Sequence, residues 1–317
     1  MNHQILISVF TSTYNRADSI YRVYDSLKKQ TCKNFEWILI DDGSTDNTDM
    51  VIQRILSEKI ITIHHIRFNK NSGKHIAHNK AIEIASGELF SIVDSDWELE
   101  ENALQYAINC WFNIPEQEKN ALFAMYFGCN LVDGASHSLS ISAEYVITDE
   151  IEMQYKLKLS GDCWTVGKTS VFREYLFPGD FVGHYYPEGI IWKRISQNYK
   201  IIVYSKELCV IHFDNENSIS RGKRTLQSAA KYVCLVAADD LNNYLKYAIS
   251  SPQLFINTII RFFVYSFFTQ NLITTWKTLN VTSALLVLLF LPFDIAGLLV
   301  FYVIQIYRKI NGTSAFS

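Results

Sequence analysis

The sequence predicts an α/β protein with a mainly parallel central sheet that helices cover on both faces. Short, continuously apolar runs alternate with segments whose apolar residues recur at helical spacing. Continuous apolar strands are buried on both faces, which is typical of parallel sheets. Several of these runs end in polar clusters, and ligands of open parallel sheets bind beyond the carboxyl ends of the strands. We therefore expect a ligand site at that edge.

Four strands and three helices are expected in the N-terminal third of the chain. Each helix follows a strand, because the apolar spacing changes to every three or four residues after the strand ends. A side-chain oxygen of Ser44 or Thr45 can cap the second helix. In chain order, the expected elements are a strand at 5–10, a helix through 20–27, a strand at 35–40, a helix through 51–56, a strand at 60–68, a helix at 76–85 and a strand at 89–93.

The composition excludes several classes of protein. The 317 residues include 29 Lys and Arg against 32 Asp and Glu, and this net charge of −3 argues against a nucleic-acid-binding surface. Hydrophobic residues make up 49% of the chain, while 13 Gly and 5 Pro are too few for a disordered or collagen-like protein. The chain can therefore bury one large core or two modest ones.

The cysteines and the N-terminus both indicate a reducing compartment. The six cysteines form no CxxC pair and no spacing that a zinc site would use, so we expect reduced thiols in the core. The first residues, MNHQILISVFTS, lack the basic and apolar regions of a signal peptide. We therefore expect the first half of the chain to lie in the cytoplasm.

The C-terminal third predicts a membrane-associated helical region. Residues 281–304 contain one ionisable side chain, Asp294, and at about 1.5 Å per residue they are long enough to cross a bilayer. Pro292 and Asp294 near the middle, with basic residues on both sides, leave a tilted span, a re-entrant hairpin and an in-plane helix open. Residues 254–268 are apolar around Arg261, as in a helix at the membrane interface. A buried helical subdomain is the alternative without a membrane.

Two acidic clusters follow apolar strands. Asp41 and Asp42 can accept hydrogen bonds from a base or a ribose, and a capping turn is the alternative explanation. Asp94 and Asp96 offer hard oxygen ligands that can hold Mg²⁺ or Mn²⁺ against a diphosphate. Because both clusters end strands of the same predicted sheet, we expect them to lie at one edge.

A third polar cluster is Asn71-Ser72-Gly73-Lys74, followed by Asn79 in the next helix. It combines a glycine turn, a cation and a helix N-terminus, and these groups suit phosphate oxygens. The chain contains neither GxGxxG nor GxxxxGK[ST], which argues against dinucleotide and P-loop chemistry.

Four motifs in order resemble the family 2 glycosyltransferases, which are inverting, nucleotide-sugar-dependent enzymes of the GT-A fold. The motifs are FTSTYNR, DDGSTDNT, NSGKHIAHNKAIEIASGEL and VDSDW, and the resemblance covers roughly residues 5–220. It implies a UDP-sugar or another nucleotide-diphosphate sugar as the donor. Ser12 and Tyr14 would line the base pocket, and Asp42 would hold the base edge. The donor-binding residues implied are Ser12, Tyr14, Arg16, Asp41, Asp42, Lys74, Asp94 and Ser95, and Asp96 would bind the metal, Mg²⁺ or Mn²⁺.

The acceptor hydroxyl needs one carboxylate base on the face opposite the leaving diphosphate. Glu188, in HYYPEGIIWKRI, is the candidate, because Pro187 delivers it to the start of an amphipathic helix. Members of the family usually carry Glu-Asp here, with the Asp as base, whereas this chain has Glu188-Gly189. Asp180 is the substitute, and a plain helix N-terminal charge is the structural alternative.

Two further segments add candidates. GDCW at 161–164 resembles the acceptor side of the family, so Asp162 and Trp164 are candidate acceptor-binding residues, and Trp164 could instead pack in the core. His212 can complete the metal shell, or it can be a structural histidine. Arg221 can clamp the diphosphate.

Together, these features predict a membrane-associated inverting glycosyltransferase with a cytoplasmic catalytic domain, of the kind expected in bacterial surface polysaccharide assembly. We expect a catalytic domain at 1–222, with a donor half at 1–97 and an acceptor half at 98–222, a helical linker at 223–250 and a membrane-associated helical region at 251–317. The expected partners are a nucleotide-diphosphate sugar, a glycan or lipid-linked saccharide acceptor and the membrane. A non-catalytic nucleotide-sugar-binding scaffold and a sugar nucleotidyltransferase are the alternatives.

Overall fold

The computed structural model describes residues 5–135, 141–157, 159, 161–179, 181, 185–212, 225–292, 295–297 and 299–301. The chain divides into two compact units, Met1–Asp214 and Asn215–Ser317. The first unit therefore ends before the boundary at 222 that the sequence suggested.

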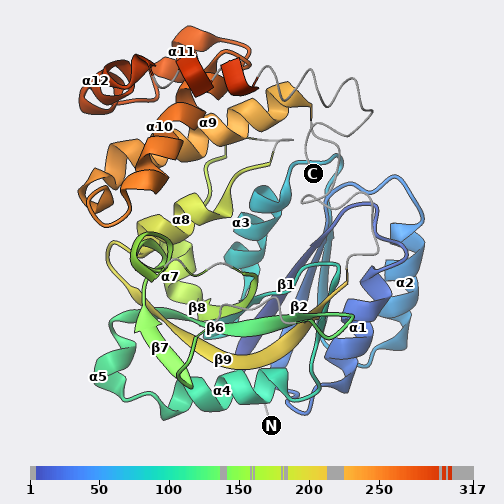
Figure 1. The fold of residues 1–317 in the computed structure, drawn as a ribbon. Helices are drawn as coiled ribbons and strands as arrows, with labels where there is room; N and C mark the ends of the chain where they lie inside the picture. Colours follow the sequence, from blue (N-terminus) through green and yellow to red (C-terminus); the bar gives the residue numbers. More distant parts are fainter. Residues whose placement is uncertain are drawn as a thin grey trace. The chain divides into compact units, whose positions relative to one another are not determined.

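One sheet forms the centre of the first unit (Figure 1). Its strand order is β3-β2-β1-β4-β8-β6-β9-β5, and β7 pairs with β9. The strands are β1 (Ile7–Thr13), β2 (Phe35–Asp41), β3 (Ile63–Arg67), β4 (Leu89–Ile92), β5 (Trp97–Leu99), β6 (Leu122–Leu131), β7 (Tyr145–Thr148), β8 (Cys163–Lys168) and β9 (Lys200–Ile211).

The first four strands confirm the expected succession of parallel strands and helices. β1 pairs in parallel with β2 and β4, and β2 pairs in parallel with β3. The connecting helices are α1 (Ile20–Lys29), α2 (Thr48–Glu58) and α3 (Lys74–Ile84). The polar loops that follow β1, β2 and β4 therefore lie at the same edge of the sheet, as expected.

The rest of the sheet corrects the expectation of a mainly parallel arrangement. β8 runs antiparallel to β4 and β6, and β5 and β7 run antiparallel to β9, whereas β6 and β9 are parallel. The sheet is mixed because, after β4, neighbouring strands are no longer joined by successive strand-helix-strand crossovers. The helices of this part are α4 (Ala103–Asn113), α5 (Glu116–Lys119), α6 (Glu150–Glu152), a π-helical turn (Met153–Leu157), α7 (Thr169–Glu174) and α8 (Glu188–Ile195).

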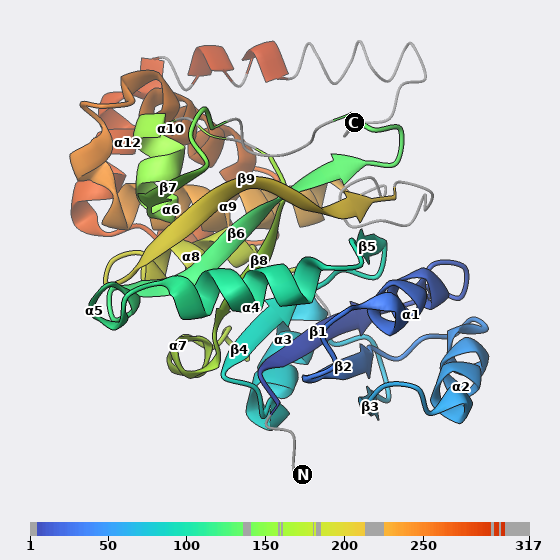
Figure 2. The same cartoon turned by 90° about the horizontal axis from the view of Figure 1, so that it is seen from below.

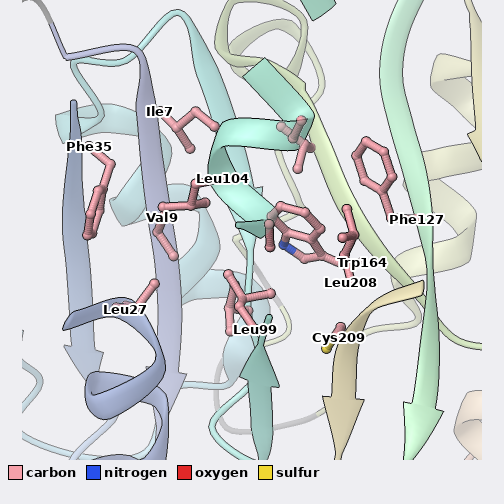
Figure 3. Packing of buried hydrophobic residues seen from close by; sticks show 14 of the residues in the cluster. Ile7, Val9, Leu27, Phe35, Leu99, Leu104, Phe127, Trp164, Leu208 and Cys209 are labelled. Carbon is pink, nitrogen blue, oxygen red and sulfur yellow. The ribbon is translucent and has the colours of Figure 1, made fainter. Parts of the chain in front are cut away.

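Alternate residues of the central strands build two cores, one on each face of the sheet. Val9 packs into the cluster that includes Leu27 of α1 and Leu104 of α4 (Figure 3), and Figure 2 shows these two helices on the same face. The next residue, Phe10, faces α3 instead, where its ring centroid lies 5.6 Å from that of His78. Helices therefore cover both faces of the sheet, as the continuous apolar strands predict.

The second unit is helical in its described part. It consists of α9 (Leu226–Asn243), a 3₁₀ turn (Leu245–Tyr247), α10 (Pro252–Ser266), α11 (Leu272–Trp276) and α12 (Val281–Leu289). α10 packs against α9, and α12 packs against both. α9, which was expected in a linker at 223–250, is therefore an integral helix of the second unit.

The expected apolar helix at 254–268 corresponds to α10, and α12 begins the apolar run at 281–304. Asp294, near the middle of that run, lies outside the described residues. Within the parts of the chain that the structure describes, no helix combines the length and the apolar character that crossing a membrane requires.

Candidate active site

Reciprocal hydrogen bonds join the loops that follow β1 and β2. The backbone N–H of Asn15 donates to Ser44 Oγ (2.9 Å), and Asn15 Oδ1 accepts from the Thr45 N–H (2.8 Å). Asn15 has a φ of 52°, a left-handed conformation that Asn adopts more readily than most residues. Ser44 and Thr45 therefore fix two loops to each other, and Asn47 occupies the N-cap of α2 in their place.

Asp42 binds the backbone at the start of α3. Its carboxylate accepts hydrogen bonds from the N–H groups of Ser72 (2.7 Å) and Gly73 (2.8 Å). Burial raises the pKa of Asp42, and these two hydrogen bonds oppose the increase. Gly73 has a φ of 100°, which favours glycine. The amides that the sequence assigned to phosphate oxygens thus bind a carboxylate of the chain itself.

Asp41 is fully buried at the end of β2. Its Oδ1 accepts a hydrogen bond from the Ser44 N–H (2.8 Å), as the alternative of a capping turn predicts. Its Oδ2 lies 3.5 Å from Nε of Arg67, which also pairs with Asp49 at 3.1 Å. Asp41 therefore organises the loop after β2 and has an arginine beside it that the sequence analysis missed.

Lys74 joins the two sides of the candidate site. Its Nζ lies 2.6 Å from Asp94 Oδ1, beyond β4, and 3.0 Å from Glu188 Oε1, at the first residue of α8. Burial alone would lower the pKa of the Lys74 ammonium, but the two carboxylates raise it well above its usual range. The structure therefore brings a predicted donor residue and the predicted base to one cation, which sequence spacing could not show.

Asp96 lies close to the same charges. Burial raises the pKa of Asp96 to about 6, Asp94 adds to the increase, and Arg16 and Lys74 oppose it. A turn holds the segment, because the Trp97 N–H donates to the Asp94 carbonyl oxygen (3.0 Å). Asp94 and Asp96 are the two carboxylates of this turn whose oxygens could hold a divalent cation.

His212 lies next to Asp96 through its backbone. Its N–H donates to the Asp96 carbonyl oxygen (3.0 Å), where β9 ends against β5. Its imidazole Nε2, however, lies 3.0 Å from Glu98 Oε2, a contact that the sequence analysis did not predict. Among the described residues, no three His, Cys, Asp or Glu side chains are grouped closely enough to hold a metal ion.

The remaining predicted donor residues lie at the ends of β1 and β4. Ser12 is partly buried in β1, and Tyr14 exposes 41% of its surface in the loop that follows. Arg16 and Ser95 are both buried. The charge of Arg16 acts on Asp96, so the loop after β1 and the loop after β4 converge.

The two predicted acceptor-binding residues differ in their exposure to solvent. Trp164 is fully buried in the core (Figure 3), and its Nε1–H donates to Ser91 Oγ (2.8 Å). This position corrects its assignment as an acceptor-binding residue, because the ring has no face left for a sugar. Asp162 is exposed just before β8. Asp180 and Arg221 lie outside the described residues.

α3 and α8 share contacts that the sequence analysis missed. One helical turn beyond Lys74, the ring of His78 packs against Trp192, one turn beyond Glu188, with centroids 6.0 Å apart. Asn79, expected near phosphate, instead binds the backbone of Phe177: its Nδ2 donates to the carbonyl oxygen (2.8 Å), and its Oδ1 accepts from the N–H (2.9 Å). α3 therefore carries Lys74 and also binds the segment around Phe177, which precedes α8.

Residues 8–116 match the family described as Glycosyl transferase family 2. Among curated relatives, Glycosyltransferase GlyG of Streptococcus pneumoniae is 26% identical over 50% of this chain and 51% of its own length. UDP-Glc:alpha-D-GlcNAc-diphosphoundecaprenol beta-1,3-glucosyltransferase WfaP of Escherichia coli is 40% identical over 29% of this chain and 35% of its own. GalNAc(5)-diNAcBac-PP-undecaprenol beta-1,3-glucosyltransferase of Campylobacter jejuni is 24% identical over 68% of this chain and 67% of its own. The chain thus spans only about a third to a half of the first two relatives.

Solved structures share the fold. S. aureus TarS 1–349, in complex with UDP-GlcNAc, has a TM-score of 0.63 at 17% identity and covers 97% of this chain and 92% of its own. The mannosyltransferase PcManGT from Pyrobaculum calidifontis, in complex with GDP-Man and Mn²⁺, has a TM-score of 0.52 at 16% identity and covers 91% and 80%. The α/β fold with its mixed sheet is therefore GT-A-like.

Proposed function

We propose that this chain, whose residues 8–116 carry a glycosyl transferase family 2 domain, transfers a sugar from a nucleotide-diphosphate donor to a hydroxyl of a lipid-linked saccharide. One observation carries the proposal: Lys74 lies within ion-pair distance of both Asp94 and Glu188. Glu188 is the predicted base for the acceptor hydroxyl, and Asp94 is a predicted donor-binding residue, so one cation joins the donor side and the acceptor side of the proposed site. The TarS complex with UDP-GlcNAc supports a UDP-sugar as the donor.

Glu188 is the base in the proposed reaction. The acceptor oxygen forms a bond to the anomeric carbon, the bond from that carbon to the diphosphate oxygen breaks, and the acceptor proton moves to Glu188. A single displacement of this kind inverts the configuration at the anomeric carbon. Lys74 Nζ, 3.0 Å from Glu188 Oε1, holds the carboxylate in one orientation, which is what a positioned base requires. Glu188 therefore fills the role that the Asp of a Glu-Asp pair has in the family.

The residues beyond β4 fit a divalent cation. Burial and the nearby charge of Asp94 raise the pKa of Asp96, and Arg16 and Lys74 oppose the increase, so Asp96 is a carboxylate that a bound cation would stabilise in its charged form. Asp96 would hold Mg²⁺ or Mn²⁺, with His212 as a second candidate ligand. When bound, the cation neutralises negative charge on the departing diphosphate. The PcManGT complex, which contains Mn²⁺, supports the use of a divalent cation in the proposed reaction.

The other predicted residues keep donor roles in the proposal. Ser12 and Tyr14 line the base pocket at the end of β1, and Asp42 orders the turn before Lys74. Arg16 adds a positive charge near Asp96. Arg221 remains the candidate clamp on the diphosphate, and Asp162 the candidate on the acceptor side.

A lipid-linked acceptor would bring the enzyme to the membrane, with its catalytic domain on the cytoplasmic side. Two of the relatives carry undecaprenol-linked substrates in their names, WfaP and the Campylobacter jejuni glucosyltransferase. The apolar C-terminal third of the chain is consistent with this location.

The first test is a thermal-shift screen of nucleotide sugars in the presence of Mn²⁺. A UDP-sugar should stabilise the protein and should then be hydrolysed slowly in the absence of an acceptor. In the Glu188→Gln variant, which keeps the shape of the side chain but cannot take a proton, turnover should fall about 10²-fold or more while donor affinity changes little. Asp180→Asn is the matched variant, and loss of activity there instead would identify a different base.

Turnover assays separate the proposed transferase from the two alternatives. A non-catalytic scaffold would bind the nucleotide sugar without any turnover. A sugar nucleotidyltransferase would form the nucleotide sugar from a sugar phosphate and a nucleoside triphosphate. Either result would overturn the proposed transferase.

A further inference from the structure

α12 presents apolar side chains on its outer face. Ser283 and Val287 are fully buried, and Ser283 Oγ donates to the Leu241 carbonyl oxygen of α9 (2.9 Å), which fixes the inward face. On the outer face, the exposed fractions are 76% for Val281, 61% for Leu285, 51% for Leu288 and 76% for Leu289. These four residues recur at i, i+4, i+7 and i+8, so they form one stripe along the helix.

The segment just before α12 continues this apolar character. In α11, Leu272 and Ile273 are exposed by 39% and 70%. Lys277 is also exposed, and it lies in the short connection between α11 and α12. We call these seven residues the α11–α12 face: Leu272, Ile273, Lys277, Val281, Leu285, Leu288 and Leu289. A cation among exposed leucines and isoleucines is typical of a surface that meets lipid headgroups and acyl chains together.

The charge of this region favours an anionic lipid surface. From residue 241 to residue 292 the chain contains Lys246, Arg261 and Lys277 and no Asp or Glu. Over residues 215–317 there are nine Lys and Arg against four Asp and Glu, although the whole chain has a net charge of −3. An excess of basic residues next to an apolar surface complements the negative charge of anionic headgroups, so we take an anionic bilayer as the occupant of this surface.

The helices of this unit suit contact in the plane of the membrane interface. The nine residues of α12 extend about 13 Å at 1.5 Å per residue, far less than the roughly 30 Å of a hydrocarbon core. The fifteen residues of α10 extend about 22 Å, and Phe255, Ile259 and Phe262 bury one side of that helix within the unit. A helix in the plane of the interface needs only one apolar face, and the exposed stripe of α12 supplies one.

We infer that the α11–α12 face embeds in the plane of an anionic membrane leaflet, so that the chain binds the bilayer from one side. The inference deepens the proposed function, since it supplies the surface that would bring the enzyme to a lipid-linked acceptor. It rests on the exposed stripe and on the charge of residues 241–292, and no catalytic residue takes part in it.

The test is flotation of the full chain with vesicles, without any nucleotide. Vesicles of phosphatidylcholine with phosphatidylglycerol should bind the protein more tightly than vesicles of phosphatidylcholine alone. In the triple variant Leu285→Gln, Leu288→Gln and Leu289→Gln, binding should weaken by about tenfold or more for each leucine. The matched control substitutes Met50, Ile60 and Val132, which are exposed by 67%, 54% and 65% in the first unit, with Gln and should bind as the wild type does.

A charge variant tests the electrostatic part separately. Lys277→Gln should weaken binding to the phosphatidylglycerol vesicles about fivefold and leave binding to phosphatidylcholine nearly unchanged. Lys206→Gln, an exposed lysine of β9, is its control.

Sided proteolysis distinguishes in-plane contact from a span. Trypsin outside sealed vesicles should cut after Arg308, which follows the apolar run in the sequence and is not part of the α11–α12 face. Protection of Arg308 in sealed vesicles, with cleavage once detergent opens them, would overturn the in-plane arrangement. Equal vesicle binding by the wild type and the triple variant would show that the α11–α12 face is not the membrane-binding surface. If the wild type does not bind vesicles and the triple variant differs from it in oligomeric state, the face is an interface between copies of the chain, and the inference is wrong.

Folding and function are checked independently. All three substituted leucines point outward, so the circular dichroism spectrum and the UDP affinity of the triple variant should match those of the wild type. If the wild type turns over a UDP-sugar but does not bind vesicles, this inference is wrong and the proposed function stands. Vesicle binding without turnover of any nucleotide sugar would refute the proposed function alone.

Discussion

His78 should make the protein less stable as the pH falls from neutral to mildly acidic values. The imidazole is 3% exposed, and neither ring nitrogen has a hydrogen-bond partner in the described part of the chain. Five aromatic rings, those of Phe10, Phe90, Phe172, Phe177 and Trp192, surround it with centroids between 5.0 and 6.0 Å away. Burial lowers the pKa of His78 from 6.5 to about 3, and the positive charge of Lys74 adds to the decrease.

The sign and the size of the effect follow from this pKa. Between pH 6.5 and 3 the unfolded chain binds a proton at His78 and the folded chain does not, so acid favours the unfolded state. Below pH 6.5, His78 alone should therefore lower the free energy of unfolding by about 1.4 kcal/mol for each pH unit. From neutral pH to pH 5 the contribution of His78 amounts to about 2 kcal/mol.

Urea unfolding at pH 7.5 and pH 5.0, followed by tryptophan fluorescence, measures this contribution. The His78→Phe variant cannot bind the proton, so its loss of stability between the two pH values should be about 2 kcal/mol smaller than that of the wild type. His78→Gln should behave in the same way, because its side chain does not titrate. Phe90→Leu is the control: it should lower the stability at both pH values by the same amount. An unchanged pH dependence in His78→Phe would refute the buried, neutral state of this histidine.

Three further predictions concern the charges of the site and the division of the chain. Asp96→Asn should abolish transfer and weaken donor binding, as EDTA should in the wild type, and full activity in EDTA would contradict a metal at this residue. Lys74→Met should lower turnover about 10²-fold and destabilise the protein by about 2 kcal/mol, because Asp94 and Glu188 lose their shared cation. An activity assay and urea unfolding measure these two effects, and Lys80→Met is the control. Truncation after residue 222, which keeps Arg221, should give a fragment that binds nucleotide sugar and metal but not vesicles. A cut near 250 should leave α9 without α10 and cause aggregation, which size-exclusion chromatography would detect.

Much of the first half of the fold can be predicted because its signals are local. β2 is apolar apart from Glu36 and its last residue, Asp41, and the apolar spacing changes to that of α2 within a few residues. The mixed half cannot be predicted in this way. β6 and β9 are parallel neighbours that are far apart in the sequence, since Leu122 pairs with Lys200. An apolar run predicts a strand, but it does not predict which other strand pairs with it.

Trp164 shows where a local signal was available and was outweighed. The preceding Gly161, Asp162 and Cys163 suggest a polar surface, and the resemblance to an acceptor segment pointed the same way. Along β8, however, Trp164 and Val166 alternate with Cys163 and Thr165, and the period of two places the tryptophan on the buried face with the valine. The hydrogen bond from its indole to Ser91 then satisfies the polar atom that a buried tryptophan carries.

The arrangement of the candidate site depends on contacts that no single segment encodes. Lys74 and His78 lie one helical turn apart on α3, and Glu188 and Trp192 lie one turn apart on α8, so an ion pair and a ring contact stack along the same pair of helices. The ring contact fixes the distance between the helices, and the ion pair fixes the carboxylate at the end of one of them. Glu188 could be named from the sequence because it opens a helix after Pro187. Its partner could not, because Lys74 and Glu188 are far apart in the sequence and meet through tertiary contacts between α3 and α8, such as the ring contact of His78 with Trp192.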